Sequence, residues 1–419
     1  MDFLYNTGIS LYKLGVRVAS LRNRKAKQMI EGQARTFGYL KERLTPGTRY
    51  IWVHAASLGE FEQGRPLIEK IKANQPDAHI VLSFFSPSGY EVRKGYNMVD
   101  AVVYLPFDLP ENVDKFINLV NPQMAIFIKY EFWGNYLKTL KRRGIPTYLV
   151  SAIFRPGQVF FKPWGAAFRD LLSCFTTMFV QNAASRALLN KIGFDNVEVA
   201  GDTRFDRVAD VRKAAKDFPV VERFVSNSKF TLVAGSSWQP DEDIIVPYFN
   251  SHPGMKLILA PHEFDRERLD AILAKFKRPA SLYSCASAED VEKCDALVID
   301  CFGILSSLYR YGQVAYVGGG FGVGIHNVNE AAVYGMPVVF GPNHGKFREA
   351  TDLIACGGGF AIDGEAAFAK VMDKMLSNNT FLEKSGNIAD KYIQSHLGAT
   401  DFVYANIFGK VERGAGADR

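Results

Sequence analysis

After residue 49, short runs of apolar residues alternate with stretches whose apolar positions recur at helical spacing. This alternation is typical of α/β proteins built on doubly wound parallel sheets, in which helices connect successive strands. In the first half the expected strands are Tyr50–His54, His79–Ser83, Ala101–Tyr104, Met124–Ile128, Thr147–Val150, Phe175–Val180 and Val197–Ala200, with helices at Phe61–Ala73 and Phe132–Arg143. In the second half the expected strands are Phe230–Ala234, Lys256–Leu259, Ala296–Ile299, Val314–Val317 and Pro337–Phe340.

Two similar α/β halves would enclose a cleft, because loops at the carboxyl ends of parallel strands gather ligands. The charged stretch Asp206–Asp217 has few apolar residues and indicates a linker between the halves. The expected organisation is an N-terminal segment over residues 1–49, a first α/β domain over 50–205, a second over 206–395, and a C-terminal helix and tail over 396–419.

Composition narrows the class of protein. The chain has 419 residues, of which 47% are hydrophobic and 22% charged, which is ordinary for a globular protein and argues against disorder. No apolar run reaches the ~18 uncharged residues of a membrane span, so a multi-span membrane protein is excluded. The five cysteines include no CxxC pair, so neither a disulfide framework nor a cysteine-rich zinc site is expected, and a reducing cytoplasm fits best.

The positive charge of the chain belongs to its N-terminal end. Residues 1–49 contain ten basic and three acidic groups, a net charge of +7, which leaves −1 for the other 370 residues. The stretch Phe3–Leu21 is largely apolar and is followed by the basic run Arg22–Lys27. An apolar helix with basic flanks can dock on an anionic membrane surface. The alternative is a packed helix followed by a solvated basic turn. Nucleic acid is not an expected partner, because no basic patch continues into the body.

Three side chains in the first half are candidates for acid–base or charge chemistry. Glu60 follows the first strand in Ala55–Phe61, where Gly59 permits a tight turn into a helix, and its carboxylate could accept a proton from a hydroxyl. The alternative is a carboxylate that only complements the helix dipole. Glu131 follows another apolar strand, and Arg204 lies at the end of the first half. An Arg there could neutralise phosphate charge, or could simply form a structural ion pair.

The second half contains a glycine-rich segment typical of ligand-binding loops. Five glycines fall within Gly318–Gly324, after an apolar strand, and a helix is expected to start near Asn327. Glycines allow close approach of the backbone to a ligand, and free N–H groups at a helix start favour phosphate. Glu330 could accept hydrogen bonds from ribose hydroxyls. His326 and Glu330 are four residues apart, but two ligands are too few for a metal site, and none is expected.

Other loops in the second half also follow predicted strands. They are Gly235–Trp238, Ala260–His262 and Asp300–Ile304, and each alone is a weak signal. No GxSxG turn or phosphate-binding P-loop is present, which argues against serine hydrolases and P-loop kinases.

Several motifs in order along the chain resemble the bacterial 3-deoxy-D-manno-octulosonic acid (Kdo) transferases. The motifs are Ser57-Leu58-Gly59-Glu60, Ser86-Pro87-Ser88-Gly89, Tyr104 to Pro110, Glu131-Phe132-Trp133, Gln181-Asn182, Gly201 to Asp206, His326 to Ala332 and Gly341-Pro342. The resemblance implies a GT-B glycosyltransferase fold, with two Rossmann-like domains and a cleft between them. It also implies CMP-Kdo as the donor, a lipid A precursor as the acceptor, no cofactor, and a place on the cytoplasmic face of the inner membrane, peripheral or with one N-terminal anchor.

The resemblance also implies roles for individual residues. Glu60 matches the general base of an inverting displacement, and Glu131 and Arg204 match residues that stabilise the transition state. The residues that match the cytidine monophosphate pocket are Pro261, His262, Phe302, Gly303, Ile304, Asn327, Val328, Asn329 and Glu330. The alternatives are another GT-B enzyme that uses a UDP-sugar, either a transferase or an epimerase, and a non-enzymatic nucleotide-sugar-binding protein on the membrane.

Overall fold

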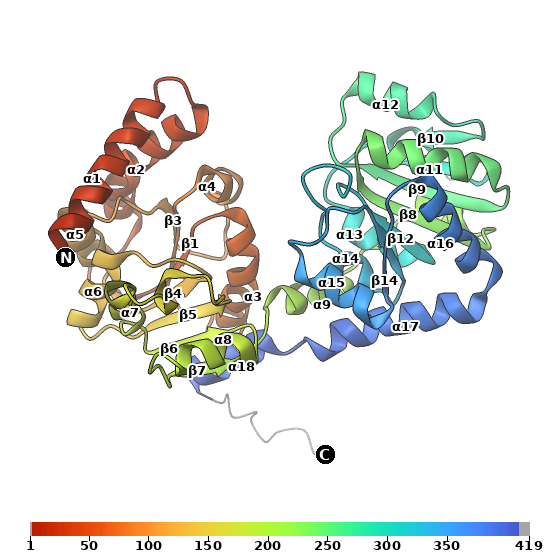
Figure 1. Cartoon of the computed structure of the whole chain (residues 1–419). Coiled ribbons are helices and arrows are strands. Elements are labelled where there is room, and N and C mark those ends of the chain that lie inside the picture. The colour runs from red at the N-terminus through yellow and green to blue at the C-terminus, as the bar shows by residue number, and fades with distance from the viewer. Residues whose placement is uncertain (1, 288, 410–419) are drawn as a thin grey trace, which may run out of the picture. The chain divides into compact units, whose positions relative to one another are not determined.

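The computed structural model describes residues 2–287 and 289–409, and it divides into two compact units (Figure 1). Unit 1 runs to Arg207 and takes up the chain again from Gly398, and unit 2 runs from Val208 to Leu397. Each unit has its own parallel sheet covered by helices, so each can be described by itself.

Helix α9 (Arg204–Lys213) contains the boundary between the units. The linker that the sequence indicates over Asp206–Asp217 is therefore helical for most of its length. Helix α18 (Ala399–Phe408), in the C-terminal segment, belongs to unit 1 and packs against α3 (Leu58–Asn74). Val403 of α18 is fully buried in the same core as the apolar face of α3. The end of the chain thus helps to build the core of the first unit.

Within the described residues, unit 1 holds a seven-stranded sheet in the order β3-β2-β1-β4-β5-β6-β7, with every neighbouring pair parallel. The strands are β1 (Tyr50–Ala55), β2 (Ile80–Phe84), β3 (Ala101–Tyr104), β4 (Pro122–Ile128), β5 (Thr147–Ala152), β6 (Thr177–Val180) and β7 (Val197–Val199). All seven strands expected in the first half are confirmed, with ends that shift by at most two residues.

Helices cover both faces of this sheet because successive strand residues point to opposite sides. In β1, Trp52 packs into one core cluster and its neighbour Val53 into the other, and both side chains are buried. The helices of unit 1 not yet given are α1 (Asp2–Ala19), α2 (Arg24–Arg43), α4 (Pro87–Arg93), α5 (Pro110–Val120), α6 (Gly134–Arg142), α7 (Ala166–Leu172), α8 (Ala183–Asn190) and the 3-10 turn η1 (Val159–Phe161). The helix expected over Phe132–Arg143 thus begins two residues later.

Over 208–287 and 289–397, unit 2 repeats the scheme with a seven-stranded parallel sheet in the order β10-β11-β9-β8-β12-β13-β14. Its strands are β8 (Phe230–Ser237), β9 (Met255–Pro261), β10 (Ala280–Leu282), β11 (Ala296–Val298), β12 (Val314–Val317), β13 (Val338–Phe340) and β14 (Gly359–Ala361). Its helices are α10 (Pro219–Val225), α11 (Gln239–Ser251), α12 (Arg266–Leu273), α13 (Leu305–Leu308), α14 (Asn329–Ala332), α15 (Arg348–Cys356), α16 (Glu365–Ser377), α17 (Asn379–Ser395) and the 3-10 turns η2 (Tyr283–Cys285), η3 (Val291–Lys293) and η4 (Tyr309–Tyr311). The edge strands β10 and β14 are absent from the sequence prediction.

The N-terminal helix α1 is fixed to unit 1 by one side and exposes apolar residues on another. The Tyr5 hydroxyl donates to Asp108 Oδ2 at 2.6 Å, and the Tyr12 ring lies against Phe107, with ring centres 5.9 Å apart. Apart from Tyr12, the exposed large apolar residues of α1 and the turn after it are Phe3, Leu4, Leu11, Leu14, Val18 and Leu21. At 100° per residue these positions fall on one face of the helix. Among the described helices, none combines the length and hydropathy needed to cross a bilayer.

Candidate active site

The order of strands in unit 1 determines which loops meet at the edge of its sheet. The chain passes from β1 to β2 and β3 on one side, and then returns to β4 on the other side of β1. In a parallel sheet, ligands bind outside the carboxyl ends of the strands at such a reversal. Glu60 follows β1, and Glu131 follows β4. The reversal therefore brings these two candidate carboxylates to one place.

Glu60 lies in the first turn of α3 and is half-buried. Its Oε2 atom accepts hydrogen bonds from the Ser57 backbone N–H at 3.0 Å and from the Ser57 hydroxyl at 3.2 Å. Burial, together with the charge of Glu131, raises the pKa of Glu60, although His54, Lys129 and the hydrogen bond with Ser57 act against the rise. The side chain thus stabilises the start of the helix and is also a better proton acceptor near neutral pH than an ordinary carboxylate.

Glu131 belongs to a buried polar network that the sequence prediction missed. Its Oε2 atom lies 3.0 Å from His54 Nε2 and accepts a hydrogen bond from Trp133 Nε1 at 2.6 Å. His54 is fully buried at the end of β1, and its other ring nitrogen lies 2.9 Å from Ser83 Oγ. The network fixes the orientation of Glu131, which is 9% exposed. The sequence feature that indicates this network is His54, a histidine within an otherwise apolar strand.

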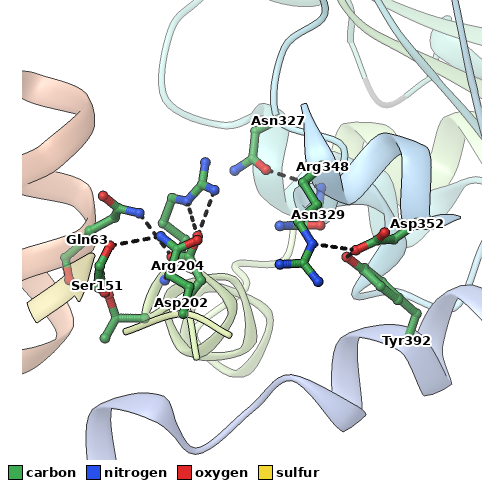
Figure 2. A network of polar contacts seen from close by, with 11 residues as sticks. Gln63, Ser151, Asp202, Arg204, Asn327, Asn329, Arg348, Asp352 and Tyr392 are labelled. Atoms are coloured by element: carbon green, nitrogen blue, oxygen red, sulfur yellow. Dashed lines mark hydrogen bonds and ion pairs between the residues drawn. The ribbon is translucent and has the colours of Figure 1, made fainter. Parts of the chain in front are cut away.

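Arg204 is paired with Asp202, so the structural ion pair considered from the sequence is present. Arg204 Nη2 lies 2.7 Å from Asp202 Oδ2, and Gln63 Nε2 donates to Asp202 Oδ1 at 3.2 Å. Figure 2 shows Gln63, Asp202 and Arg204 joined in this way, with Ser151 beside them. Burial by itself would raise the pKa of Asp202, but the Arg204 charge and the hydrogen bonds from Arg204 and Gln63 outweigh it and hold the pKa below its usual value.

This pair links Arg204 to the helix that carries Glu60. Gln63 lies three residues after Glu60 on α3, and the Thr203 hydroxyl donates to the Gln63 carbonyl oxygen. The guanidinium of Arg204 is partly exposed, so it can meet an anionic group while Asp202 holds it in place. Any role of Glu60, Glu131 or Arg204 in a reaction stays a prediction.

Unit 2 has an equivalent reversal between β8 and β12, and three aromatic side chains gather there. The ring of His262, which follows β9, lies between those of Trp238 and His326, with ring centres 4.9 Å and 4.3 Å away. Burial and the neighbouring His262 lower the pKa of His326, although Asp241 acts in the opposite direction. His326 is thus disposed to be neutral, which suits stacking and hydrogen bonding rather than charge pairing.

Asp241, at the start of α11, ties the glycine-rich loop to the sheet. Its carboxylate accepts hydrogen bonds from the Tyr316 hydroxyl at 2.7 Å and from the Gly319 N–H at 3.0 Å. A Cβ atom on Gly318 would lie 2.2 Å from the Ser236 carbonyl oxygen, so a side chain cannot fit there. This glycine is required for packing between the loops, a role distinct from the close approach to a ligand that the sequence predicts.

The residues expected around a nucleotide lie on loops at the same edge of the second sheet. Gly303 adopts a positive φ of 87° just before α13, and Phe302 is 75% exposed and stacks on Phe264. The helix expected near Asn327 is the single turn α14, so a strong helix dipole at a phosphate is not present. Asn327 Oδ1 accepts from the Asn329 N–H, a contact drawn in Figure 2.

The side chains of this segment differ in how they could serve a ligand. Asn327 Nδ2 donates to Glu330 Oε1 at 3.1 Å. Val328 is fully buried, so it could contact a ligand only through its backbone. Asn329 is buried, and its Oδ1 atom has no hydrogen-bond partner among the described residues. Pro261 and Ile304 complete the expected set, at the end of β9 and at the N-cap of α13.

A cavity of about 340 Å³ opens beside Trp238, lined also by Phe264 and Arg268. Across 2–287 and 289–409, the structure shows no group of three or more histidine, cysteine or acidic side chains that could hold a metal ion.

Comparison with known proteins shows which family the chain resembles. The model of the family described as 3-deoxy-D-manno-octulosonic-acid transferase matches residues 31–207. The curated 3-deoxy-D-manno-octulosonic acid transferase of Aquifex aeolicus is 28% identical over 367 residues, which cover 84% of this chain and 94% of that protein. The chain is thus similar to Kdo transferases over most of its length, and the family model and the curated relatives together support a bacterial Kdo transferase, which is a glycosyltransferase.

Solved structures agree on the fold of this chain. UDP-GlcNAc 2-epimerase from Neisseria meningitidis superimposes with a TM-score of 0.59 at 13% identity, covering 87% of this chain and all of that one. MurG from Acinetobacter baumannii gives a TM-score of 0.55 at 11% identity, covering 86% of this chain and 99% of that one. These likenesses establish the GT-B class with two Rossmann-like units, as the sequence predicts.

Proposed function

We propose that this enzyme transfers Kdo from CMP-Kdo to a hydroxyl of a lipid A precursor by a single inverting displacement. Similarity to the Kdo transferases supports Kdo as the transferred sugar. The donor would be held by the loops of unit 2 around His262 and Asn327, and the acceptor by unit 1. No metal takes part in the proposed step.

The observation that carries this proposal is the environment of Glu60. A half-buried carboxylate whose pKa is raised by burial and by Glu131 lies in the first turn of α3, just after the first strand of its sheet. Such a group can take the proton of the acceptor hydroxyl as its oxygen attacks the anomeric carbon of Kdo, while the bond from that carbon to the CMP oxygen breaks. Both hydrogen bonds from Ser57 end on Oε2, and the described residues offer no hydrogen bond to Oε1. Oε1 is therefore the proposed proton acceptor.

Positive charge is available to balance the charges that develop. Arg204 is held by Asp202, and Lys129 lies close enough to Glu60 to affect its pKa. The donor phosphate and the acid group of Kdo are both anionic, so oriented cationic groups would lower the barrier to transfer. In the proposed role, Asp202 is a positioning residue because it acts through Arg204.

We also place the enzyme on the anionic cytoplasmic surface of the inner membrane. The exposed apolar face of α1 and the basic run from Arg22 support this, because an amphipathic helix with cationic neighbours binds such surfaces. A lipid acceptor would be met there without leaving the bilayer.

The test is incubation of the full chain with CMP-Kdo and a tetraacylated lipid A precursor, followed by mass analysis of the lipid product and assay of the released nucleotide. The expected result is addition of a Kdo mass to the lipid, with release of CMP. Parallel incubation with UDP-sugars separates the alternatives. Release of UDP, or epimerisation of a UDP-sugar without any use of CMP-Kdo, would overturn the proposal.

A further inference from the structure

Unit 1 contains a cavity of about 650 Å³ that the proposed chemistry does not use. Its volume is within the range of about 300–1,000 Å³ common for small-molecule sites. We call it the α1–α7 cavity, and its principal lining side chains are Leu4, Tyr5, Tyr130, Phe132, Phe168 and Leu171. They come from α1, from the loop between β4 and α6, and from α7.

The walls of the α1–α7 cavity are fixed by contacts outside it. The Tyr5 hydroxyl donates to Asp108 and accepts from the Gly134 N–H at 3.0 Å, so the start of α1 is held against the body of the unit. The rings of Phe132 and Phe160 pack with their centres 4.9 Å apart. The cavity is thus preformed, which lowers the entropy cost of binding.

The chemistry of the lining favours a hydrocarbon chain. The Tyr5 hydroxyl is already engaged, and Gln158 Oε1 accepts from the Arg155 N–H at 2.9 Å. A sugar or nucleotide placed here would lose hydrogen bonds to water and gain few in return, which is costly. An alkyl chain loses none. Lys138 is the one charged side chain among the described residues of the lining.

The position of the cavity indicates which lipid it takes. Tyr130 and Phe132 line it and flank Glu131, so a chain in the cavity carries its headgroup toward the candidate carboxylates. At the outer side, Leu4 is 74% exposed and Phe168 is 45% exposed. Leu4 also belongs to the exposed apolar face of α1, so the cavity is continuous with the proposed membrane contact.

We propose that the α1–α7 cavity binds one hydrocarbon chain of the lipid acceptor and thereby holds the sugar headgroup beside Glu60 and Glu131. This inference rests on the proposed function, because it takes the acceptor to be an acylated sugar. It adds that the enzyme itself, and not only the bilayer, recognises an acyl chain.

Ala167→Trp tests this, because Ala167 lines the cavity and a tryptophan there would fill it. Ala166→Trp is the matched control, since Ala166 is the exposed neighbour on the same helix and is not part of the lining. Initial rates are measured with the tetraacylated precursor and with its fully deacylated sugar. In Ala167→Trp the KM for the acylated acceptor is expected to rise about tenfold or more, because several methylenes lose their buried site. The KM for CMP-Kdo, the rates on the deacylated sugar and all values of the control are expected to stay unchanged.

Unchanged KM for the acylated acceptor in Ala167→Trp, or an equal rise with the deacylated sugar, would overturn the inference. Leu4→Gln, at an exposed position, is expected to raise the same KM and covers the case in which Ala167→Trp fails to fold. Binding of a fluorescent dodecyl probe to the wild type provides a readout that does not need transfer. The acylated precursor is expected to displace the probe, and displacement only by bulk phospholipid would contradict the assignment. If the acylated precursor displaces the probe as expected but Kdo is transferred neither to it nor to the deacylated sugar, the proposed function is refuted instead.

Discussion

The substitution Glu60→Gln removes the ability of this side chain to take a proton but leaves an oxygen in place. Glu60 Oε2 accepts from the Ser57 backbone N–H at 3.0 Å and from the Ser57 hydroxyl at 3.2 Å. A glutamine oxygen can accept the same hydrogen bonds, because Glu and Gln both serve at the third position of a capping box. The start of α3 is therefore expected to be unchanged in Glu60→Gln.

Two opposing effects of the lost charge keep the change in stability small. A carboxylate at a helix N-terminus stabilises the helix by about 0.3–1 kcal/mol. Burial and the charge of Glu131 oppose ionisation, and a pKa raised in the folded state means that ionised Glu60 destabilises the fold at neutral pH. The free energy of unfolding of Glu60→Gln should thus differ from wild type by less than about 1 kcal/mol. Glu60→Ala loses both hydrogen bonds and should be less stable by about 1–2 kcal/mol.

The turnover number separates chemistry from stability in these variants. Loss of a general base lowers the rate about 10²–10⁴-fold, so both variants should lose activity to this extent although only Glu60→Ala loses stability. The assay measures Kdo addition to the lipid acceptor at saturating CMP-Kdo, alongside denaturant unfolding. Glu62→Gln, the same change two residues away on α3, is the control and should keep its activity, since a partly exposed ion pair contributes little. A Glu60→Gln enzyme with near-normal turnover would refute the assignment of the base.

Further predictions concern the groups around Glu60. The rate of transfer should fall as the pH drops through the raised pKa of Glu60, because the base must be ionised. Glu131→Gln removes a like charge and should therefore move the acidic limb of the pH–rate profile to lower pH. An acidic limb that stays in place would contradict the coupling between the two carboxylates. Asp202→Asn should lower kcat and destabilise the fold by about 2 kcal/mol, because it removes the charged partner of Arg204, and a normal kcat would show that positioning is not needed. The free energy of binding to anionic vesicles, measured by pelleting, should become less favourable by about 1 kcal/mol for each exposed basic residue changed to glutamine. The positions are Lys13, Arg17, Arg22, Arg24, Lys25 and Lys27. Unchanged pelleting would refute the membrane contact. Kdo transfer should persist in the presence of a chelator, and its loss would contradict the metal-free step.

Most strands found from the sequence have both faces buried; the exception is the edge strand β7, which is as exposed as β14 and was still found. Every residue of β1 is buried, because helices cover both sides of a parallel sheet, and this produces a continuous apolar run. The two missed strands, β10 (Ala280–Leu282) and β14 (Gly359–Ala361), are three-residue edge strands, and partly exposed residues interrupt their burial. Their pairing depends on the neighbouring strand more than on their own sequence, so no local pattern indicates them.

The candidate site was predictable in its position and not in its internal contacts. Glu60 and Glu131 were identified because each follows a strand that the pattern predicts. The partner of Glu131 is His54, 77 residues away, and the partner of Asp202 is Gln63, 139 residues away. No spacing along the chain reports such pairs, since the sheet order and the docking of α3 bring them together.

Backbone geometry supports the location of the two candidate sites independently of residue chemistry. Lys129, Ser151 and Ser236 have positive φ values of 70°, 56° and 54°, a conformation that costs residues other than glycine on the order of 1–3 kcal/mol. All three lie at or just after the carboxyl ends of strands β4, β5 and β8. The pairing register also shifts at Ser151 and at Ser236, and such bulges are frequent next to active sites. The strained dihedral angles and the register shifts are features of the backbone that played no part in choosing Glu60, Glu131 or Arg204, so their place near the reversals in strand order is separate support for the location of the two candidate sites.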